Sequence, residues 1–150
     1  MSTANTNQKV TFSKILVAMD GSDESMNAAD YAIFISKEYN AELYALHVIR
    51  ADVDLFGLHE ASEYTTIMRS EGRKYLNKVN LKANEKNIQI KTEIISSTNI
   101  AGGIVNYAEE ENIDLIVIGT RGLSGFKKLL LGSVAANVVT YAHCPVLVVK

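Results

Sequence analysis

The sequence has very little of what builds disulfide-rich, zinc-stapled or membrane-spanning proteins. Its one cysteine, Cys144, cannot form an internal disulfide and cannot supply a structural zinc site alone. Its one proline, Pro145, follows directly, and no stretch rich in glycine, serine or proline divides the chain. No apolar run approaches the roughly 20 residues that a membrane-spanning helix needs. We therefore interpret Cys144 as a small buried apolar side chain and expect no membrane partner.

An excess of basic charge is also missing. The net charge is −2, whereas a nucleic-acid-binding protein usually carries a basic excess or a basic face. The tyrosines are scattered and lack the pattern of a base-stacking platform. The three histidines, His47, His59 and His143, have no metal-ligand spacing such as His-x-x-x-His. We therefore expect no nucleic-acid partner, and we interpret the histidines as structural or surface residues.

What the chain does have is enough apolar sequence for one domain. It has 150 residues, of which 47% are hydrophobic and 21% charged, as in ordinary globular domains. We expect residues 1–12 to form a disordered lead-in and residues 13–150 to form a single domain. The first ten residues are polar and carry no apolar signal-peptide core, so the expected location is the cytoplasm.

Apolar runs of strand length alternate with helical stretches along this domain. The run at residues 14–19 is continuous, which suits a strand buried on both faces of a parallel sheet. Strands are predicted at 14–19, 42–49, 88–95, 114–119 and 146–149, helices at 22–40, 61–87, 97–111 and 132–142, and a loop at 50–60. Because each parallel crossover needs a helix, this order predicts an α/β fold with a doubly wound, five-stranded parallel sheet.

Residues at the predicted element boundaries support this division. Ser22 is a good N-cap for the first helix, and Asn40 is a plausible C-terminal stop. Ser97 or Thr98 would cap the third helix. The third strand alternates apolar and polar residues, which indicates a less buried strand at an edge of the sheet.

A phosphate site is predicted from glycines at two places in this pattern. Ligands of such sheets bind outside the carboxyl ends of the strands, where the strand order reverses. Gly119 and Gly122 follow the fourth strand, and glycine lets main-chain N–H groups approach a phosphate because no Cβ is in the way. Gly132-Ser133 opens the last helix, whose free N–H groups attract anions. The result is a split site, with Asp20 at the end of the first strand as its neighbour.

Several other sites of α/β proteins lack their residues here. Neither Gly-x-x-x-x-Gly-Lys-[Ser/Thr] nor Gly-x-Gly-x-x-Gly occurs. The sequence therefore lacks the main motif of an ordinary P-loop ATPase and that of a Rossmann dehydrogenase. Ser124 does not stand in Gly-x-Ser-x-Gly, and no nucleophilic triad is evident. A response-regulator receiver would need an Asp after the third strand, which instead ends Ile95-Ser96-Ser97.

The glycine spacing resembles a known signature. Gly119-x2-Gly122-x9-Gly132-Ser133 resembles the ATP-binding motif of the universal stress protein family. Ile15–Ser22 and Cys144–Val149 resemble that family's opening and closing strands, so that the resemblance covers Ser13–Lys150. It implies strand order 3-2-1-4-5 with helices on both faces, a fold similar to that of the adenine nucleotide α-hydrolases. It also implies ATP as the ligand, accompanied by Mg or Mn, and a homodimer that pairs through Val146–Val149.

The same resemblance assigns nucleotide-binding positions residue by residue. Asp20 matches the family's acid beside the ribose and the metal or phosphate region. Val48 matches the position whose main chain reads the adenine edge. The other matching positions are Ala18 and Met19 beside the adenine, Gly119, Arg121 and Gly122 in the loop near the ribose and phosphates, and Gly132, Ser133 and Val134 at the phosphate-binding helix start.

Three functional hypotheses follow. The leading one is a cytoplasmic ATP-binding stress-response protein that regulates a partner protein and hydrolyses ATP slowly at most, since Asp20 is the sole candidate for a general base. The second is a true ATPase or nucleotidyl-transfer enzyme that uses the same site. The third is a dimeric interaction module that works without nucleotide.

Overall fold

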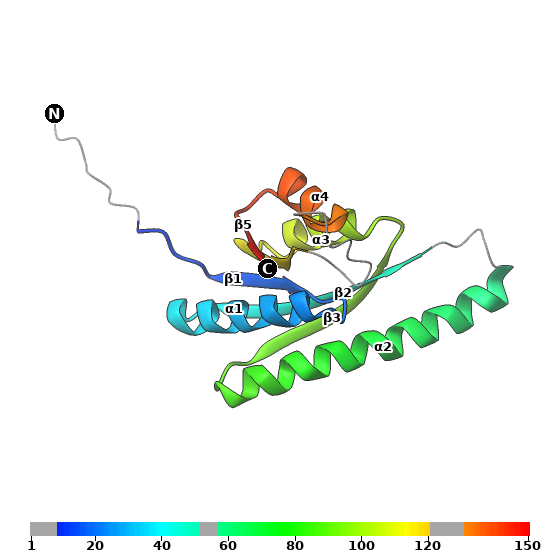
Figure 1. Cartoon of the computed structure of the whole chain (residues 1–150), viewed down its shortest axis with the longest axis horizontal. Helices are drawn as coiled ribbons and strands as arrows, with labels where there is room; N and C mark the ends of the chain where they lie inside the picture. Colours follow the sequence, from blue (N-terminus) through cyan, green and yellow to red (C-terminus); the bar gives the residue numbers. More distant parts are fainter. Residues whose placement is uncertain (1–8, 52–56, 121–130) are drawn as a thin grey trace.

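Strands and helices alternate in the order that the sequence predicts. The computed structural model describes residues 9–51, 57–120 and 131–150 (Figure 1). Its elements are β1 (Lys14–Ala18), α1 (Asp23–Tyr39), β2 (Glu42–Arg50), α2 (Gly57–Glu85), β3 (Ile90–Ser97), α3 (Ile100–Glu110), β4 (Leu115–Gly119), α4 (Ser133–Tyr141) and β5 (Val146–Val149).

The strands form one sheet, in which every pair of neighbours is parallel. The order is β3-β2-β1-β4-β5, which confirms the expected order 3-2-1-4-5. The continuous apolar sequences of β1 and β4 occupy the centre, and every residue of β4 is buried. The alternating strand β3 lies at one edge with its residues exposed or half-buried, as predicted.

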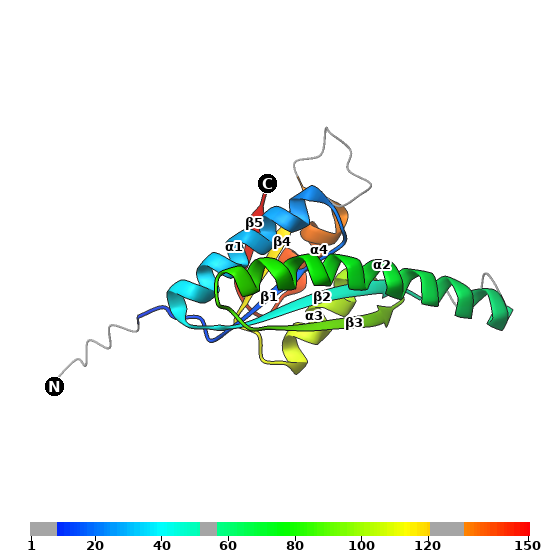
Figure 2. The same cartoon turned by 90° about the horizontal axis from the view of Figure 1, so that it is seen from below.

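Helices cover both faces of the sheet. Ile15 and Val17 of β1 pack in a core with α1 and α2, whereas Leu16 points to the opposite core with α3 and α4. Figure 1 shows α3 and α4 gathered on one side of the strands, and Figure 2 shows α1 and α2 on the other. Burial of one Val, Leu or Ile side chain contributes about 1.5–3 kcal/mol, so this two-sided core stabilises the sheet between its helices.

The first helix begins and ends at the residues that the sequence indicates. The Ser22 hydroxyl accepts a hydrogen bond from the N–H of Ser25 at 3.1 Å, which caps the free amino end of α1. Asn40 adopts a left-handed conformation with φ 53°, and its N–H donates to the carbonyl of Lys37. The helix therefore starts directly after the carboxyl end of β1, which places its first turn at the candidate site.

Two other boundaries differ from the prediction. Residues 50–60 were predicted as a loop, but the main chain is helical from Gly57 onward. The N-cap of α3 is Asn99, whose Oδ1 accepts from the N–H of Gly102 at 2.9 Å, and neither Ser97 nor Thr98 fills this role. The reason is that β3 runs through Ser97, two residues past its predicted end, which moves the cap along the chain.

The buried part of α2 begins later along the chain than the apolar pattern indicates. The sequence marks one apolar face of this helix; its members Leu76, Val79 and Ala83 are buried as expected, but its member Ile67 is 58% exposed. Figure 2 shows that α2 reaches beyond the ends of the strands, so its first turns have no sheet to cover. Sequence periodicity predicts the face of a helix, whereas the length of the sheet decides how much of that face is buried.

Only part of the predicted lead-in, residues 1–12, can be compared with the structure, because residues 1–8 lie outside the described residues. Phe12 packs on Tyr39 of α1, with ring centroids 5.1 Å apart, and joins the core under α1 and α2. Within the described residues, no helix combines the length and the apolar character that a membrane crossing requires.

Candidate functional site

The candidate site lies where β1 and β4 run side by side in the sheet. Their register pairs Ile15 with Leu115 and Val17 with Val117. From the end of β1 the chain continues into α1 on one face, and after β4 it continues to α4 on the other face. In doubly wound sheets, the crevice that binds ligands lies outside the carboxyl ends of two such neighbouring strands, so we place the candidate site there.

Asp20 stands at the end of β1 and is tied to the start of α1. Its Oδ1 accepts hydrogen bonds from the main-chain N–H of Ser22, at 2.9 Å, and from the Ser22 hydroxyl. Among the described residues, Oδ2 has no hydrogen-bond partner. The carboxylate is half-buried, so a fixed and partly solvated oxygen remains for a hydroxyl group or a metal ion.

The turn after Asp20 requires glycine. Gly21 has φ +85°, a left-handed conformation that disfavours side chains. A Cβ at this position would also lie 2.5 Å from the ring of Tyr75 on α2. The turn therefore brings the end of β1 against α2, and the aromatic ring of Tyr75 covers it.

Close packing explains why residue 119 is a glycine, and the sequence alone did not show this contact. The prediction attributed it to close approach of a phosphate. A Cβ there would lie 2.9 Å from the carbonyl carbon of Glu24, which is main chain of α1. Packing of α1 against the end of β4 therefore already requires glycine at this position.

The two halves of the predicted split site meet at Thr120. Its N–H donates to the carbonyl of Val149 at 2.8 Å, and its carbonyl accepts from the N–H of Gly132. The residues between them, 121–130, lie outside the described residues, and this includes the predicted site residues Arg121 and Gly122. The segment thus leaves and rejoins the described structure at one hydrogen-bonded point beside the end of β4.

The start of α4 offers main-chain donors. Gly132 is its N-cap, with φ −65° and ψ 160°, and no side chain caps the helix. Ser133 is exposed, Val134 is half-buried against the core under α3 and α4, and the first turn has no acidic residue. Free N–H groups at an uncapped helix start are suited to an anion.

The positions expected beside the adenine contribute in different ways. Ala18 is half-buried on the α3 and α4 side, whereas the side chain of Met19 is buried in the core under α1 and α2. Val48 is also buried, with its side chain on the α3 and α4 side. Met19 and Val48 can therefore offer a ligand main-chain atoms, not side chains.

The main chain of Val48 is open toward the crevice. Leu46 accepts from the N–H of Met19, which directly follows β1, at 2.8 Å, so the even-numbered residues of β2 turn their main-chain groups toward β1. Val48 lies beyond the last paired residues, Ala18 and Leu46. Its N–H forms no hydrogen bond with any described residue, and it lies just past the end of the β1–β2 pairing.

His47 was interpreted from the sequence as a structural or surface residue, but the structure places it beside this site. Its Nδ1 lies 2.7 Å from the carbonyl oxygen of Met19. Its ring packs edge-on against Tyr75, with centroids 5.5 Å apart. The signal in the sequence was a histidine inside the mainly apolar run 43–49, directly before Val48.

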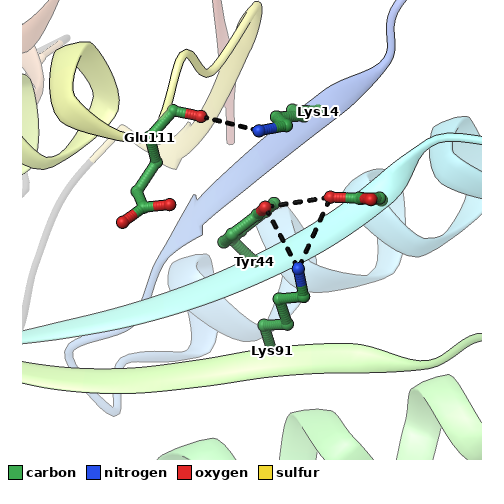
Figure 3. A network of polar contacts seen from close by, with 5 residues as sticks. Lys14, Tyr44, Lys91 and Glu111 are labelled. Atoms are coloured by element: carbon green, nitrogen blue, oxygen red, sulfur yellow. Dashed lines mark hydrogen bonds and ion pairs between the residues drawn. The ribbon is translucent and has the colours of Figure 1, made fainter.

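The opposite edge of the sheet holds a different kind of polar cluster (Figure 3). The Tyr44 hydroxyl donates to Glu42 at 2.9 Å, and the Lys91 ammonium lies 3.6 Å from the same carboxylate. Lys14 donates to the main-chain carbonyl of Glu111 at 3.2 Å. The Tyr44 hydrogen bond and then the charge of Lys91 lower the pKa of Glu42, while Tyr44 and Glu42 raise the pKa of Lys91.

Two further groups with shifted pKa lie in the core under α3 and α4. Burial, and then a hydrogen bond with Glu93, raises the pKa of Tyr107 above its ordinary range. Burial, and then the charge of Asp114, raises the pKa of Cys144 and keeps its thiol protonated. Cys144 is half-buried and packs against this core, in line with its interpretation as an apolar side chain.

The described residues contain no group of three or more His, Cys, Asp or Glu side chains that could hold a metal ion. Asp20 is the carboxylate at the end of β1 with an oxygen that no described residue engages. One carboxylate suits Mg²⁺ or Mn²⁺ only when a ligand's phosphates supply further oxygens. The residues present therefore fit a metal ion that arrives with a nucleotide.

Comparisons with known proteins agree with the fold. The model of the universal stress protein family matches residues 11–150. A universal stress protein of Methanocaldococcus jannaschii is 45% identical over 143 residues, which cover 93% of this chain and 82% of the relative. The structure of the universal stress protein UspA from Lactobacillus plantarum matches with a TM-score of 0.87 at 26% identity, over 95% of this chain and 100% of the other.

A further solved structure bears on the ligand. It is a universal stress protein in complex with cAMP, which matches with a TM-score of 0.68 at 27% identity, over 94% of this chain and 98% of the other. That neighbour is thus a nucleotide-bound protein with a similar sheet.

Proposed function

The chain belongs to the universal stress protein family, and we propose that it binds ATP in the crevice at the carboxyl edge of its sheet. The observation that carries the proposal is a pair of open main-chain sites on either side of Asp20. One is Val48 on β2, beyond the end of β1, and the other is the uncapped start of α4 beside the end of β4. Adjacent strands lie about 4.8 Å apart, so β2 and β4 are separated by roughly 10 Å. That distance suits a base at one end and a phosphate group at the other.

Each site residue has a proposed role in this arrangement. The main chain of Val48 would bind the edge of the adenine, with Ala18 and Met19 beside the ring. Asp20 would accept hydrogen bonds from the ribose hydroxyls through Oδ2. The phosphate groups would lie against Gly132, Ser133 and Val134 at the start of α4, and against the loop that includes Gly119, Arg121 and Gly122.

ATP is proposed over smaller ligands because the site offers anion donors at a helix start. Free N–H groups and the helix dipole stabilise negative charge there. Mg²⁺ or Mn²⁺ would bind with the phosphates and could also contact Asp20. The cAMP complex of the structural neighbour supports an adenine nucleotide as the ligand class.

The proposed activity is regulatory. ATP occupancy would change the surface around the carboxyl edge and so alter the binding of a partner protein in the cytoplasm during stress. Asp20, the acid at the end of β1, is already tied to Ser22 by two hydrogen bonds, so hydrolysis is expected to be slow. A steady-state phosphate assay tests this point, because turnover above roughly 1 s⁻¹ would favour an enzyme.

Isothermal titration with ATP tests the binding proposal, and the start of α4 offers a matched pair of variants. Ser133→Glu places a negative charge where phosphate is expected, whereas Ser133→Gln adds a neutral group of the same size. We expect Ser133→Glu to weaken ATP binding at least about tenfold, and Ser133→Gln to bind more tightly than Ser133→Glu. Because Ser133 is exposed and an acid at a helix start is favourable, neither variant should unfold the domain.

Failure of the wild-type protein to bind ATP at millimolar concentration would overturn the proposal. Equal binding by both Ser133 variants would place the phosphates elsewhere. If ATP binding were lost and stress-related function survived, the protein would act as an interaction module without nucleotide.

A homodimer through β5 is part of the same proposal. β5 lies at the sheet edge, pairs with β4 on one side, and keeps Val146, Leu147 and Val148 half-buried. An apolar edge strand with free main-chain groups favours pairing, and a two-fold contact is the commonest solution. Sedimentation velocity at micromolar concentration should show a dimer, and Val148→Lys should shift it toward monomer.

A further inference from the structure

The ladder between β1 and β2 lacks the last hydrogen bond that a regular parallel pairing would form at this end. In a parallel ladder, the Met19 N–H donates to Leu46 and the Met19 carbonyl then accepts from Val48. The first bond is present at 2.8 Å, whereas the second is absent from the hydrogen bonds of the described residues. The Met19 carbonyl instead lies 2.7 Å from Nδ1 of His47. A side chain has thus taken the place of the main-chain donor.

The chemistry of this contact fixes the state of the His47 ring. A carbonyl oxygen can only accept a hydrogen bond, so Nδ1 must carry a proton. When the imidazole is neutral, this requires the tautomer with hydrogen on Nδ1. The Met19 carbonyl is thus engaged by the imidazole, and the N–H of Val48 has no partner among the described residues.

Helix α2 holds the ring in this position. A Cβ on Gly72 would lie 2.5 Å from Cδ2 of His47, so the helix approaches the imidazole closely. The ring of Tyr75 packs edge-on against it and also covers Gly21, next to Asp20. The imidazole is therefore clamped between α2 and the end of β1.

We propose that His47 is a positioning residue that ends the β1–β2 ladder and so keeps the Val48 N–H free to donate a hydrogen bond to an acceptor nitrogen of the adenine ring. This inference rests on the proposed nucleotide site and assigns the residue that prepares its base-binding end. It also makes α2 part of that site, because Gly72 and Tyr75 hold the ring that captures the Met19 carbonyl.

Two substitutions of His47 separate the effect of its N–H donor from the effect of its size. Asn places an amide N–H near the position of Nδ1, so His47→Asn should retain the contact with Met19. Leu fills space but donates nothing, so His47→Leu should let Val48 pair with Met19. By isothermal titration, we expect ATP binding about tenfold weaker in His47→Leu and within about threefold of wild type in His47→Asn.

Amide hydrogen exchange of Val48, measured by NMR, gives a readout that packing alone would not move. In the nucleotide-free wild type the Val48 amide should exchange rapidly and become protected when ATP binds. In nucleotide-free His47→Leu it should already be protected. A long-range ¹H–¹⁵N spectrum should also show the Nδ1-protonated tautomer in the wild type.

A second route to the same effect leaves His47 unchanged. Gly72→Ala pushes a methyl group against the imidazole, so it should weaken ATP binding and protect the Val48 amide, as His47→Leu does. Gly102→Ala adds the same methyl group to α3 at an ordinary distance of 3.5 Å from Asn99 and is the matched control, with affinity near that of the wild type. Unchanged affinity and unchanged Val48 exchange in both His47→Leu and Gly72→Ala would overturn the inference while leaving the proposed function intact. A wild-type protein that binds no adenine nucleotide would overturn both.

Discussion

The two edges of the parallel sheet satisfy their main-chain groups in different ways. At the amino edge, the Asp114 carboxylate accepts from the N–H groups of Ser13, at 2.8 Å, and Lys14. At the carboxyl edge, the N–H of Val48 and the first turn of α4 have no such side chain. The amino edge is therefore closed by the protein itself, and the carboxyl edge is left open for a ligand.

This difference separates stability from function within one sheet. An unpaired main-chain group is costly when it is buried away from water, so proteins pair nearly all such groups. Open groups on both sides of a crevice are therefore informative, whereas the closed cluster around Asp114, Tyr44 and Lys91 is a sign of local stabilisation. Substitutions at the carboxyl edge should change nucleotide binding, and substitutions at the amino edge should change stability alone.

The largest expected effect breaks this division, because Gly119 lies at the carboxyl edge but packs against α1. In Gly119→Ala the added Cβ would meet the main chain of Glu24 at 2.9 Å, and two main chains cannot yield as a flexible side chain can. We expect the free energy of unfolding to fall by about 2–3 kcal/mol. Urea denaturation followed by circular dichroism measures this change.

Gly102→Ala is the matched control for that substitution. A Cβ on Gly102 would lie 3.5 Å from Asn99, an ordinary contact, and the residue is inside α3. Alanine should stabilise this helix by about 0.5–1 kcal/mol. If Gly119→Ala were as stable as the wild type, close packing against α1 would not be the reason for glycine there.

Residues close together in the sequence predicted many of the helix and strand boundaries that position the two edges of the sheet. Ser22 and Asn40 delimit α1 as expected, because each acts through hydrogen bonds to residues within a few positions. Asn99 was missed as a cap because β3 continues to Ser97, and the length of a strand depends on its neighbours in the sheet. The burial of Ile67 was mispredicted for a similar reason, since α2 extends past the sheet it covers.

In the candidate site, too, local features were predicted from the sequence and contacts between distant elements were not. Glycine spacing indicated the start of α4 and the end of β4, because uncapped helix starts and tight turns are local features. His47 could not be assigned, because its role depends on Gly72 and Met19, which come from two other elements. The reason for Gly119 likewise depends on α1, and the spacing of residues along the chain does not show such a contact.

A smaller effect, confined to binding, is expected at Asp20. In Asp20→Asn the amide oxygen can still accept from Ser22, so the start of α1 should keep its structure. The second carboxylate oxygen is replaced by a donor, which removes the proposed acceptor for the ribose hydroxyls. We expect ATP to bind about tenfold more weakly, with little change in thermal stability.

A ligand without ribose hydroxyls sharpens the assignment of Asp20. For 2′,3′-dideoxy-ATP, the wild type and Asp20→Asn should bind with similar affinity in isothermal titration. If the variant lost affinity equally for ATP and for the dideoxy analogue, Asp20 would act on the metal or the phosphates instead of the ribose.

The smallest effect is expected at the amino edge, where Glu42 is exposed and water screens its interactions. The Tyr44 hydroxyl and the Lys91 ammonium lower the pKa of Glu42 from its ordinary 4.5, so the ionised carboxylate is favoured in the folded state. Its contribution to stability is present above pH 4.5 and is lost as the pH falls through the lowered pKa. Glu42→Gln should therefore melt slightly below the wild type at about pH 7, and the difference should shrink toward about pH 3.

Glu109→Gln, on the exposed face of α3, controls for the loss of one negative charge, and ATP affinity should be the same in all three proteins. A change in ATP affinity in Glu42→Gln would show that the two edges of the sheet are coupled.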